Sequence, residues 1–473
     1  MKNKSYLILK DQRIVRSIIL LALPIMFSNI FKSLHDIVDM YFISNIDDTI
    51  EIVEAQVSAI TITGPIMQIC QALALGLMVA GTAIMSQYLG ANQVAEAKKA
   101  SGQLLLLSII VGVVFNILLF IFTPLIIKYM GIDTNSDLYK YSVEYVQFRS
   151  FEQTGLFIIY AFQASRQSTG DTVTPVVLNV VSVVLNIILT WFLVDIIGMD
   201  IRGAALATVV ANMIVIPVCF ILMMQKKNNI LPLKWKDLKF DYRLSKMLFV
   251  IGMPAAISQA FTSFGFLLIN SLVADFDGYI INAIGVGNRI NSLLLFPAMS
   301  VGTVLATFIG QNIGAGQINR AKRSLWMSML ISFVITIGGA VFLMFLRGPL
   351  VSIFIDKTDN PRAFNMCVYF LYFLILGLPL MGIFQIWTGC FQGAGRTGLS
   401  LLLASARLWV FRLPLIWFLM NIIKIGPASV WYAMVISNFG AAILGTFLYK
   451  FIDFKPKVSK MQEKIVKIHE GVN

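Results

Sequence analysis

Long apolar segments follow one another along nearly the whole chain, and short polar or charged segments separate them. Apolar runs of 18 or more residues are typical of membrane-spanning helices, which need about 20 residues to cross a bilayer. The pattern therefore predicts an all-α, polytopic membrane protein. The runs between turn and charge signals predict twelve spans, at residues 15–43, 56–86, 101–127, 141–163, 173–194, 203–224, 245–273, 279–310, 324–346, 363–388, 397–421 and 427–450.

The composition agrees with this pattern. Of the 473 residues, 58% are hydrophobic and 13% are charged, whereas about 25% of the residues in a soluble domain are charged. A net charge of +13 would suggest nucleic-acid binding in a soluble protein. Here the basic residues lie in short loops and in the two tails, with no patch of the nucleic-acid type. We therefore expect membrane lipid as a partner, and no nucleic acid.

The basic residues also predict the orientation of the chain. Lys and Arg are concentrated in the amino-terminal tail, in alternate loops and in the carboxy-terminal tail, whereas acids such as Glu51 and Glu54 lie on the opposite side. Loops rich in Lys and Arg stay in the cytoplasm. We therefore expect both termini to be cytoplasmic.

Three pairs of segments repeat in the same order in the two halves of the chain. QYLGANQVAEAK (Gln87–Lys98) aligns without gaps with QNIGAGQINRAK (Gln311–Lys322), 224 residues later. LALPIMFSN around Pro24 aligns with IGMPAAISQ around Pro254 at an offset of 230, and STGDT aligns with GAGRT at 225. Parallel repeats of this kind are common in secondary transporters.

The repeats predict two pseudo-symmetric six-helix lobes, because an even number of spans in each copy preserves its orientation. We predict an N-terminal lobe at 1–224, a basic cytoplasmic linker at 225–246, a C-terminal lobe at 247–451 and a basic cytoplasmic tail at 452–473.

One polar cluster lies near the end of the first span. SLHDIVDMYF contains His35, Asp36 and Asp39, which can share one face of a helix because Asp39 follows the others by four and three residues. A charged side chain at mid-bilayer costs about 2.5–3.5 kcal/mol, so it is usually paired, hydrated or used to handle ions. Hydration near an acidic outer loop is the alternative for Asp36. His35 either senses pH or only hydrogen-bonds its neighbour.

Other ionisable residues in the spans have simpler interpretations. Glu144 and Glu152 flank Arg149, and an internal salt bridge is favoured over substrate contact. Lobe-stabilising pairs or extension of the side chain to the membrane interface are the expectation for three further arginines, Arg289, Arg407 and Arg412.

An enzyme is disfavoured by the absence of catalytic motifs. The sequence contains no HExxH, no GxSxG and no clustered metal ligands, and its four cysteines are isolated within apolar segments. We expect no enzymatic activity and no cofactor.

Several segments together are similar to those of the MATE (multidrug and toxic compound extrusion) transporter family. They are ALPIMFSNIFKSLHDIVDMYFI, GLMVAGTAIMSQYLGANQVAEAKKA, GMPAAISQAFTSFGFLLINSLVADF, AIGVGNRINSLLLFPAMSVGTVLATFIGQNIGAGQINRAKR and FQGAGRTG. This ordered set extends over almost the full chain. The resemblance implies a MATE-like fold and a monomer in a bacterial cytoplasmic (inner) membrane. It also implies an antiporter, driven by H+ or Na+, that exports amphiphilic, cationic small molecules.

The resemblance also implies a coupling site. The carboxy-terminal half lacks the acids of the NorM-like branch and is therefore more similar to the bacterial DinF-like branch. Asp39 in IVDMYF matches the first-helix aspartate that couples transport to a cation, and Asn186 in VLNIILT and Thr208 in GAALAT match the DinF-like sodium pattern. Together these three residues could hold Na+. Thr190 stands where that pattern has a second aspartate, which leaves H+ and Na+ both open.

Two alternatives are compatible with the sequence. Asn186 and Thr208 could form an ordinary interhelical hydrogen bond. The whole chain could be a lipid-linked saccharide flippase of the same wider superfamily. A large anionic headgroup would require several basic residues in the cavity, and the spans contain few.

Overall fold

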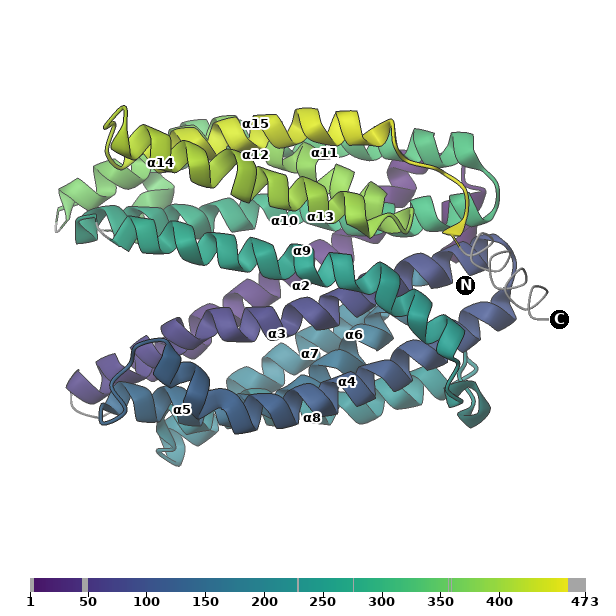
Figure 1. The fold of residues 1–473 in the computed structure, drawn as a ribbon, viewed down its shortest axis with the longest axis horizontal. Helices are drawn as coiled ribbons and strands as arrows, with labels where there is room; N and C mark the ends of the chain where they lie inside the picture. Colours follow the sequence, from purple (N-terminus) through teal and green to yellow (C-terminus); the bar gives the residue numbers. More distant parts are fainter. Residues whose placement is uncertain are drawn as a thin grey trace. The chain divides into compact units, whose positions relative to one another are not determined.

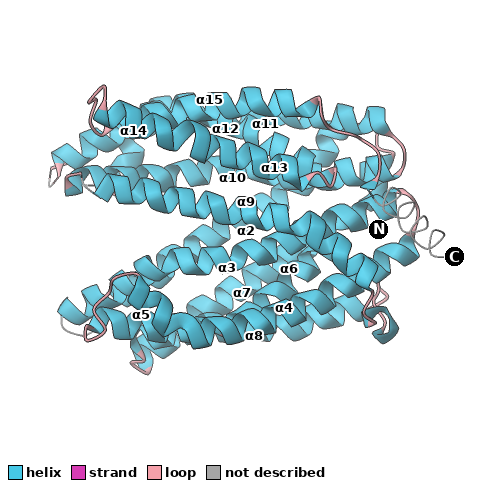
Figure 2. Ribbon diagram, in the orientation of Figure 1, coloured by secondary structure: helices cyan, strands magenta, loops and turns pink. Residues whose placement is uncertain are grey.

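The computed structural model describes residues 4–44, 50–227, 229–274, 276–355, 357–358 and 360–457 of the chain (Figure 1). Within these residues every regular element is a helix, and none is a strand (Figure 2). The prediction of an all-α protein is confirmed.

The chain divides into two compact units, each with its own core. Unit 1 consists of Met1–Met26 and Ile257–Asn473, and unit 2 consists of Phe27–Ala256. The boundary lies inside two helices, because α2 (Ile14–Ser44) and α9 (Tyr242–Ala274) each contribute one part to each unit.

Unit 2 contains the rest of α2, the start of α9 and the elements between them. These are α3 (Ile50–Gly90), α4 (Val94–Tyr129), α5 (Asp137–Ser150), α6 (Glu152–Ser168), α7 (Val173–Thr190), the π-helix η1 (Trp191–Ile196), α8 (Asp200–Met224) and the 3-10 helix η2 (Trp235–Leu238).

Unit 1 contains the beginning of α2, the end of α9 and the remaining elements. These are α1 (Lys4–Leu9), α10 (Gly278–Gly314), α11 (Ile318–Ser352), α12 (Pro361–Gly393), α13 (Thr397–Ser405), the π-helix η3 (Ala406–Arg412), α14 (Leu413–Asn421) and α15 (Ala428–Tyr449).

The helices correspond to the predicted spans. Among the described residues, eleven helical segments are long and apolar enough to cross a membrane. The remaining predicted span, 141–163, is formed by α5 and α6, which are interrupted at Phe151. The multi-pass architecture is thereby confirmed.

Large apolar side chains cover the outside of these helices. On α4 the exposed side chains include Ile110, Val113, Val114, Ile117, Leu118 and Ile121. Soluble monomers rarely expose continuous apolar patches of this kind, whereas lipid tails solvate them well. The apolar periodicity of these segments therefore reflects a lipid-facing surface as well as an internal core.

The sequence repeat is accompanied by a repeat of backbone conformation. Asn92 and Gly316, which are 224 residues apart, both have positive φ, at 59° and 72°. Gly170 and Gly395, which are 225 apart, have φ of 80° and 67°. The left-handed region favours Gly and tolerates Asn. The two halves therefore make the same helix-to-helix turns.

The unit boundary falls at equivalent places in the two repeats. It lies two residues after Pro24 in α2 and two residues after Pro254 in α9. Proline inside a helix removes a backbone hydrogen bond and permits a bend. The predicted lobes, 1–224 and 247–451, differ from these compact units and remain a prediction.

Small residues bring α10 and α12 close together in unit 1. A Cβ atom on Gly389 would overlap the carbonyl oxygen of Gly302, and one on Gly393 would overlap that of Ala306. Small residues spaced four apart on both helices allow this close approach, as in many membrane helix pairs.

Candidate functional site

A polar stripe runs along one face of α7 in unit 2. Asn179, Ser182, Asn186 and Thr190 follow one another at intervals of three and four residues, which places them on one side of an α-helix. Asn186 and Thr190 are buried. The opposite side is apolar and exposed, and includes Val177, Val181, Val184 and Ile188. The polar face of α7 therefore points into the unit.

Asn186 and Thr208, two of the predicted site residues, lie in direct contact. The Asn186 Nδ2 atom donates a hydrogen bond of 2.9 Å to the Thr208 hydroxyl. That hydroxyl donates in turn to the carbonyl oxygen of Ala204 at 3.1 Å. The two side chains are 1% and 5% exposed. The contact joins α7 to α8, and Thr190 lies one helical turn further along α7.

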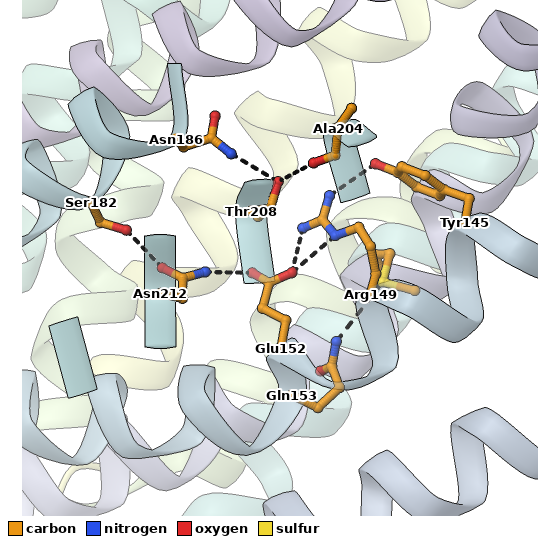
Figure 3. A network of polar contacts seen from close by, with 10 residues as sticks. Tyr145, Arg149, Glu152, Gln153, Ser182, Asn186, Ala204, Thr208 and Asn212 are labelled. Atoms are coloured by element: carbon orange, nitrogen blue, oxygen red, sulfur yellow. Dashed lines mark hydrogen bonds and ion pairs between the residues drawn. The ribbon is translucent and has the colours of Figure 1, made fainter. Parts of the chain in front are cut away.

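Glu152, at the start of α6, connects the neighbouring helices (Figure 3). Its Oε2 accepts hydrogen bonds from Nε and Nη2 of Arg149 at 2.9 and 2.7 Å. Its Oε1 accepts from Nδ2 of Asn212 at 2.9 Å, and Asn212 Oδ1 accepts from the Ser182 hydroxyl at 2.8 Å. Arg149 also donates to the Tyr145 hydroxyl at 2.9 Å. The network therefore links α5, α6, α7 and α8.

The pairing of Glu152 with Arg149 confirms the predicted internal salt bridge. The two side chains are only 6% and 15% exposed. A buried charge is tolerated when it is paired and hydrogen-bonded, and both conditions are met here. Glu144 does not join this pair. It forms a more exposed bidentate pair with Arg202, at 2.7 and 2.8 Å.

A second polar chain connects α7 to α2. Asn179 Nδ2 donates to the Ser28 hydroxyl at 3.1 Å, and Asn179 Oδ1 accepts from Gln163 at 3.0 Å. One turn after Ser28, the ammonium of Lys32 lies 5.9 Å from the centre of the Tyr160 ring. The Ser28 face of α2 is therefore turned towards α6 and α7.

The side chains of His35, Asp36 and Asp39 lie outside the described residues. The backbone of α2 continues as a helix through these positions to Ser44. Their predicted roles remain predictions.

The described residues offer a cation only part of a site. Asn186 and Thr208 provide an amide oxygen and a hydroxyl oxygen, which are hard ligands but carry no charge. The Glu152 carboxylate is already bound by Arg149 and Asn212. No cluster of three or more His, Cys, Asp or Glu occurs among the described residues. A cation bound at Asn186 and Thr208 would therefore need a carboxylate such as that of Asp39.

Sequence reasoning missed three polar members of these networks. Asn179, Ser182 and Asn212 were not identified, although each has a polar partner on another helix. Their spacing carried the signal: Asn179 and Ser182 continue the stripe of Asn186, and Asn212 follows Thr208 by four residues.

Comparison with known sequences identifies a family. The sequence model of the MatE family matches residues 24–192 and 254–418, which together make up more than half of the chain. The two matched segments contain the equivalent prolines, Pro24 and Pro254.

Individual proteins are similar over most of their length. The chain is 24% identical to "Probable multidrug resistance protein YoeA" of Bacillus subtilis, covering 94% of this chain and 96% of the relative. It is 26% identical to a protein named "FAD transporter" of Shewanella oneidensis, covering 80% and 82%. A solved structure, described as MATE in complex with MaL6, superposes with a TM-score of 0.88 at 19% identity, covering 98% and 100%. That structure shares the fold.

Proposed function

Because the chain belongs to the MatE family of membrane transporters, we propose that it is a cation-coupled antiporter that exports small molecules by alternating access. The proposed substrates are amphiphilic and cationic, and the proposed coupling ion is H+ or Na+. We place the protein as a monomer in a bacterial cytoplasmic (inner) membrane, with both termini in the cytoplasm. The names of the similar proteins, one a multidrug resistance protein and one a transporter, support small-molecule export.

The observation that supports the coupling site most is the register between α2 and α7. The hydrogen bond between Ser28 and Asn179 places these two residues at one level. Spans one and five cross the membrane in the same direction, because three spans lie between them. Asp39 follows Ser28 by eleven residues, and Thr190 follows Asn179 by eleven.

Eleven residues amount to three helical turns, or about 16 Å along a helix. Asp39 is therefore expected on the same face as Ser28 and at the level of Thr190, one turn beyond Asn186. In this register Asp39, Asn186 and Thr208 would lie close together in unit 2. Asp39 supplies the charge, and Asn186 and Thr208 supply neutral oxygen ligands. Asp36 and His35, earlier on the same helix, are assigned supporting roles in ion binding and pH sensing.

Coupling then follows from differential binding. A carboxylate held away from water is stabilised by a proton or by a small cation. If occupancy at Asp39 favours one state of the transporter and substrate favours the other, the ion gradient drives export. An ion that bound both states equally would drive nothing.

Transport in reconstituted vesicles tests the proposal. The full chain is inserted into liposomes, and ethidium movement is followed by fluorescence with an imposed proton gradient, a sodium gradient or neither. We expect uphill ethidium movement with at least one gradient and none in protein-free liposomes. Ethidium movement that is the same with and without both gradients would contradict an antiporter. Translocation of a lipid-linked saccharide under those conditions would instead favour the flippase.

A further inference from the structure

Unit 1 contains a small cavity of about 70 Å³ that is lined by apolar and polar side chains. Helices α9, α10, α12 and α15 and the π-helix η3 supply its walls. The described residues that line it include two arginines, Arg407 and Arg412, and no aspartate or glutamate. Asparagine side chains complete much of the polar lining, namely those of Asn270, Asn288, Asn291 and Asn438.

Arg412 is 5% exposed and binds only neutral acceptors among the described residues. Its Nε donates to the Ser437 hydroxyl at 2.9 Å, and its Nη2 donates to Asn438 Oδ1 at 2.9 Å. A longer contact of 3.5 Å reaches the carbonyl oxygen of Met434. These partners satisfy donors of the guanidinium group but leave its charge uncompensated.

Arg407 is 3% exposed and has weaker partners. Its Nη1 contacts the sulfur of Met381 at 2.7 Å, and the guanidinium lies 4.2 Å from the centre of the Phe384 ring. A thioether is a weak acceptor. The Nε atom is buried with no hydrogen-bond partner within the described part of the chain. Of the two predicted alternatives for Arg407 and Arg412, a lobe-stabilising pair or extension to the membrane interface, the second is wrong, because both side chains are buried inside the unit.

The π-helix η3 brings these two arginines to one side of the helix. In an α-helix, with 3.6 residues per turn, side chains five residues apart point about 140° away from each other. A π-helix is wider, and its hydrogen bonds connect residues five apart. Arg407 and Arg412 both lie in η3 and are five residues apart, so the wider turn aligns them. Such local insertions occur frequently at functional sites.

Buried arginines have different hydrogen-bond partners in the two units. In unit 2, Arg149 has the carboxylate of Glu152 within 2.7 Å. In unit 1, two buried guanidinium groups line one cavity, and their hydrogen-bond partners among the described residues are all neutral. Burying unpaired charge is costly, and a bound counter-ion would remove much of that cost.

We propose that this cavity binds one oxyanion, a carboxylate or a phosphate group, between Arg407 and Arg412. The planar guanidinium group matches the two oxygens of such an anion, and the asparagine amides provide further donors. A drug-sized ligand needs about 300–1,000 Å³, so only one small group fits. The anion is either free in solution or an acidic group of an exported molecule. The second source rests on the proposed export function and extends its substrates beyond cations.

Binding is tested first, with purified full-length protein and inorganic phosphate. Tryptophan fluorescence and the thermal unfolding midpoint are followed during titration, with sodium chloride, whose anion is not an oxyanion, keeping the ionic strength constant. Trp431 lines the cavity and provides a local reporter. We expect a saturable response in the wild type that is weakened at least ten-fold in Arg407→Gln and in Arg412→Gln.

Arg347→Gln is the matched control. Arg347 belongs to the same unit, stacks on Tyr372 at 3.8 Å and does not line the cavity, so its replacement should leave phosphate binding unchanged. If a glutamine variant fails to fold, Arg407→Lys and Arg412→Lys replace it. These variants keep the positive charge but lose the planar set of N–H donors of the guanidinium group, so we expect them to bind phosphate more weakly than the wild type. No saturable response in the wild type, or equal responses in wild type and cavity variants, would overturn the proposal.

A transport assay then distinguishes whether the bound anion is free in solution or part of an exported molecule. Vesicles containing the protein are loaded with carboxyfluorescein, which carries carboxylates, or with ethidium, which does not. Export of carboxyfluorescein that phosphate inhibits and Arg407→Gln abolishes assigns the site to the substrate. Phosphate binding without carboxyfluorescein export assigns it to a free anion. Gradient-independent ethidium movement with intact phosphate binding would contradict the proposed function and leave the anion site standing.

Discussion

Loss of the Glu152 carboxylate should strongly destabilise unit 2. Its carboxylate binds Arg149 and Asn212, and it is nearly inaccessible to solvent. Glu152→Gln leaves the Arg149 guanidinium buried without a counter-charge. Breaking a buried pair in this way typically costs about 3–5 kcal/mol. We expect a clear decrease of the thermal unfolding midpoint, measured by tryptophan fluorescence in detergent.

Glu144→Gln provides the matched comparison. Glu144 makes a bidentate pair of similar geometry with Arg202, but the arginine side chain is 44% exposed. Exposed pairs contribute about 0–1 kcal/mol, so the midpoint should hardly change. Equal destabilisation by the two substitutions would show that burial does not set the strength of these pairs.

Thr190→Asp tests the register of the proposed coupling site. Thr190 is buried at the end of α7, one turn after Asn186. A carboxylate there would add negative charge at the level expected for Asp39 and should bind a small cation more tightly. We predict a stronger dependence of ethidium export on the sodium gradient. Thr190→Asn, of similar size and without charge, should not strengthen that dependence, and an identical response to both substitutions would count against the site.

Some contacts at this scale could be predicted from the sequence. The contact of Asn186 with Thr208 was indicated by the family pattern, and the Glu152–Arg149 pair by intramembrane charges three residues apart. The part played by Asn212 was not predictable, because its partners Ser182 and Glu152 come from two other helices. Periodicity defines the face of each helix, but not which faces meet.

At the scale of elements, Asp11 fixes the corner between α1 and α2. Its carboxylate accepts hydrogen bonds from the Arg13 backbone N–H and the Ser17 hydroxyl, each at 2.9 Å. Arg320, on α11, donates to the backbone carbonyl of Asp11 at 2.7 Å. The backbone hydrogen bond from Arg13, then that from Ser17 and the charge of Arg16, lower the pKa of Asp11 below its usual value.

This lowered pKa predicts a pH dependence. A carboxyl group with a lower pKa in the folded state stabilises the fold above its unfolded pKa, and this contribution is lost as pH falls through the folded pKa. Asp11→Asn should therefore lower the unfolding midpoint slightly at pH 7. The difference from wild type should begin to shrink as the pH falls below about 4, the ordinary pKa of Asp, and should disappear below the lowered pKa of the folded state. A constant difference between pH 7 and pH 3 would exclude this role of the charge.

The close contact of α10 with α12 should make stability sensitive to one added methyl group. Gly389→Ala places a Cβ against the carbonyl oxygen of Gly302 and forces the helices apart. Overpacking of this kind costs about 1–3 kcal/mol. Gly338→Ala on α11 is the control, because nothing lies within 4 Å of its Cβ. Ala also favours the helix over Gly by about 1 kcal/mol, so thermal unfolding should show opposite shifts for the two variants.

The helices themselves were largely predictable. Run length and hydropathy predicted all twelve spans, and the aligned segments Gln87–Lys98 and Gln311–Lys322 contain the matching turns at Asn92 and Gly316. The break at Phe151 and the π-helix η3 were not predicted, because an apolar run does not reveal which backbone hydrogen-bond pattern it adopts. The alignment of Arg407 with Arg412 depends on that pattern and was missed for the same reason.

At the scale of the whole molecule, two repeats of one fold differ in their polar interiors. Unit 2 contains a compensated Glu152–Arg149 pair beside the proposed cation site, whereas unit 1 contains two arginines around a cavity. The equivalent prolines, Pro24 and Pro254, mark the positions where α2 and α9 pass from one unit to the other. Duplication therefore preserved the turns and helices while the chemistry of the two interiors diverged.

Asp39→Asn shows whether the carboxylate of Asp39 couples export to an ion gradient. The asparagine keeps the size of the side chain but can neither bind a proton at this position nor supply a charge to Na+. Ethidium export by Asp39→Asn is compared with that by wild type and by Asp36→Asn, under a proton gradient and under a sodium gradient. We predict a loss of gradient-driven export of at least ten-fold in Asp39→Asn, with most of it retained in Asp36→Asn. Wild-type export by Asp39→Asn under both gradients would show that Asp39 does not couple export to either ion.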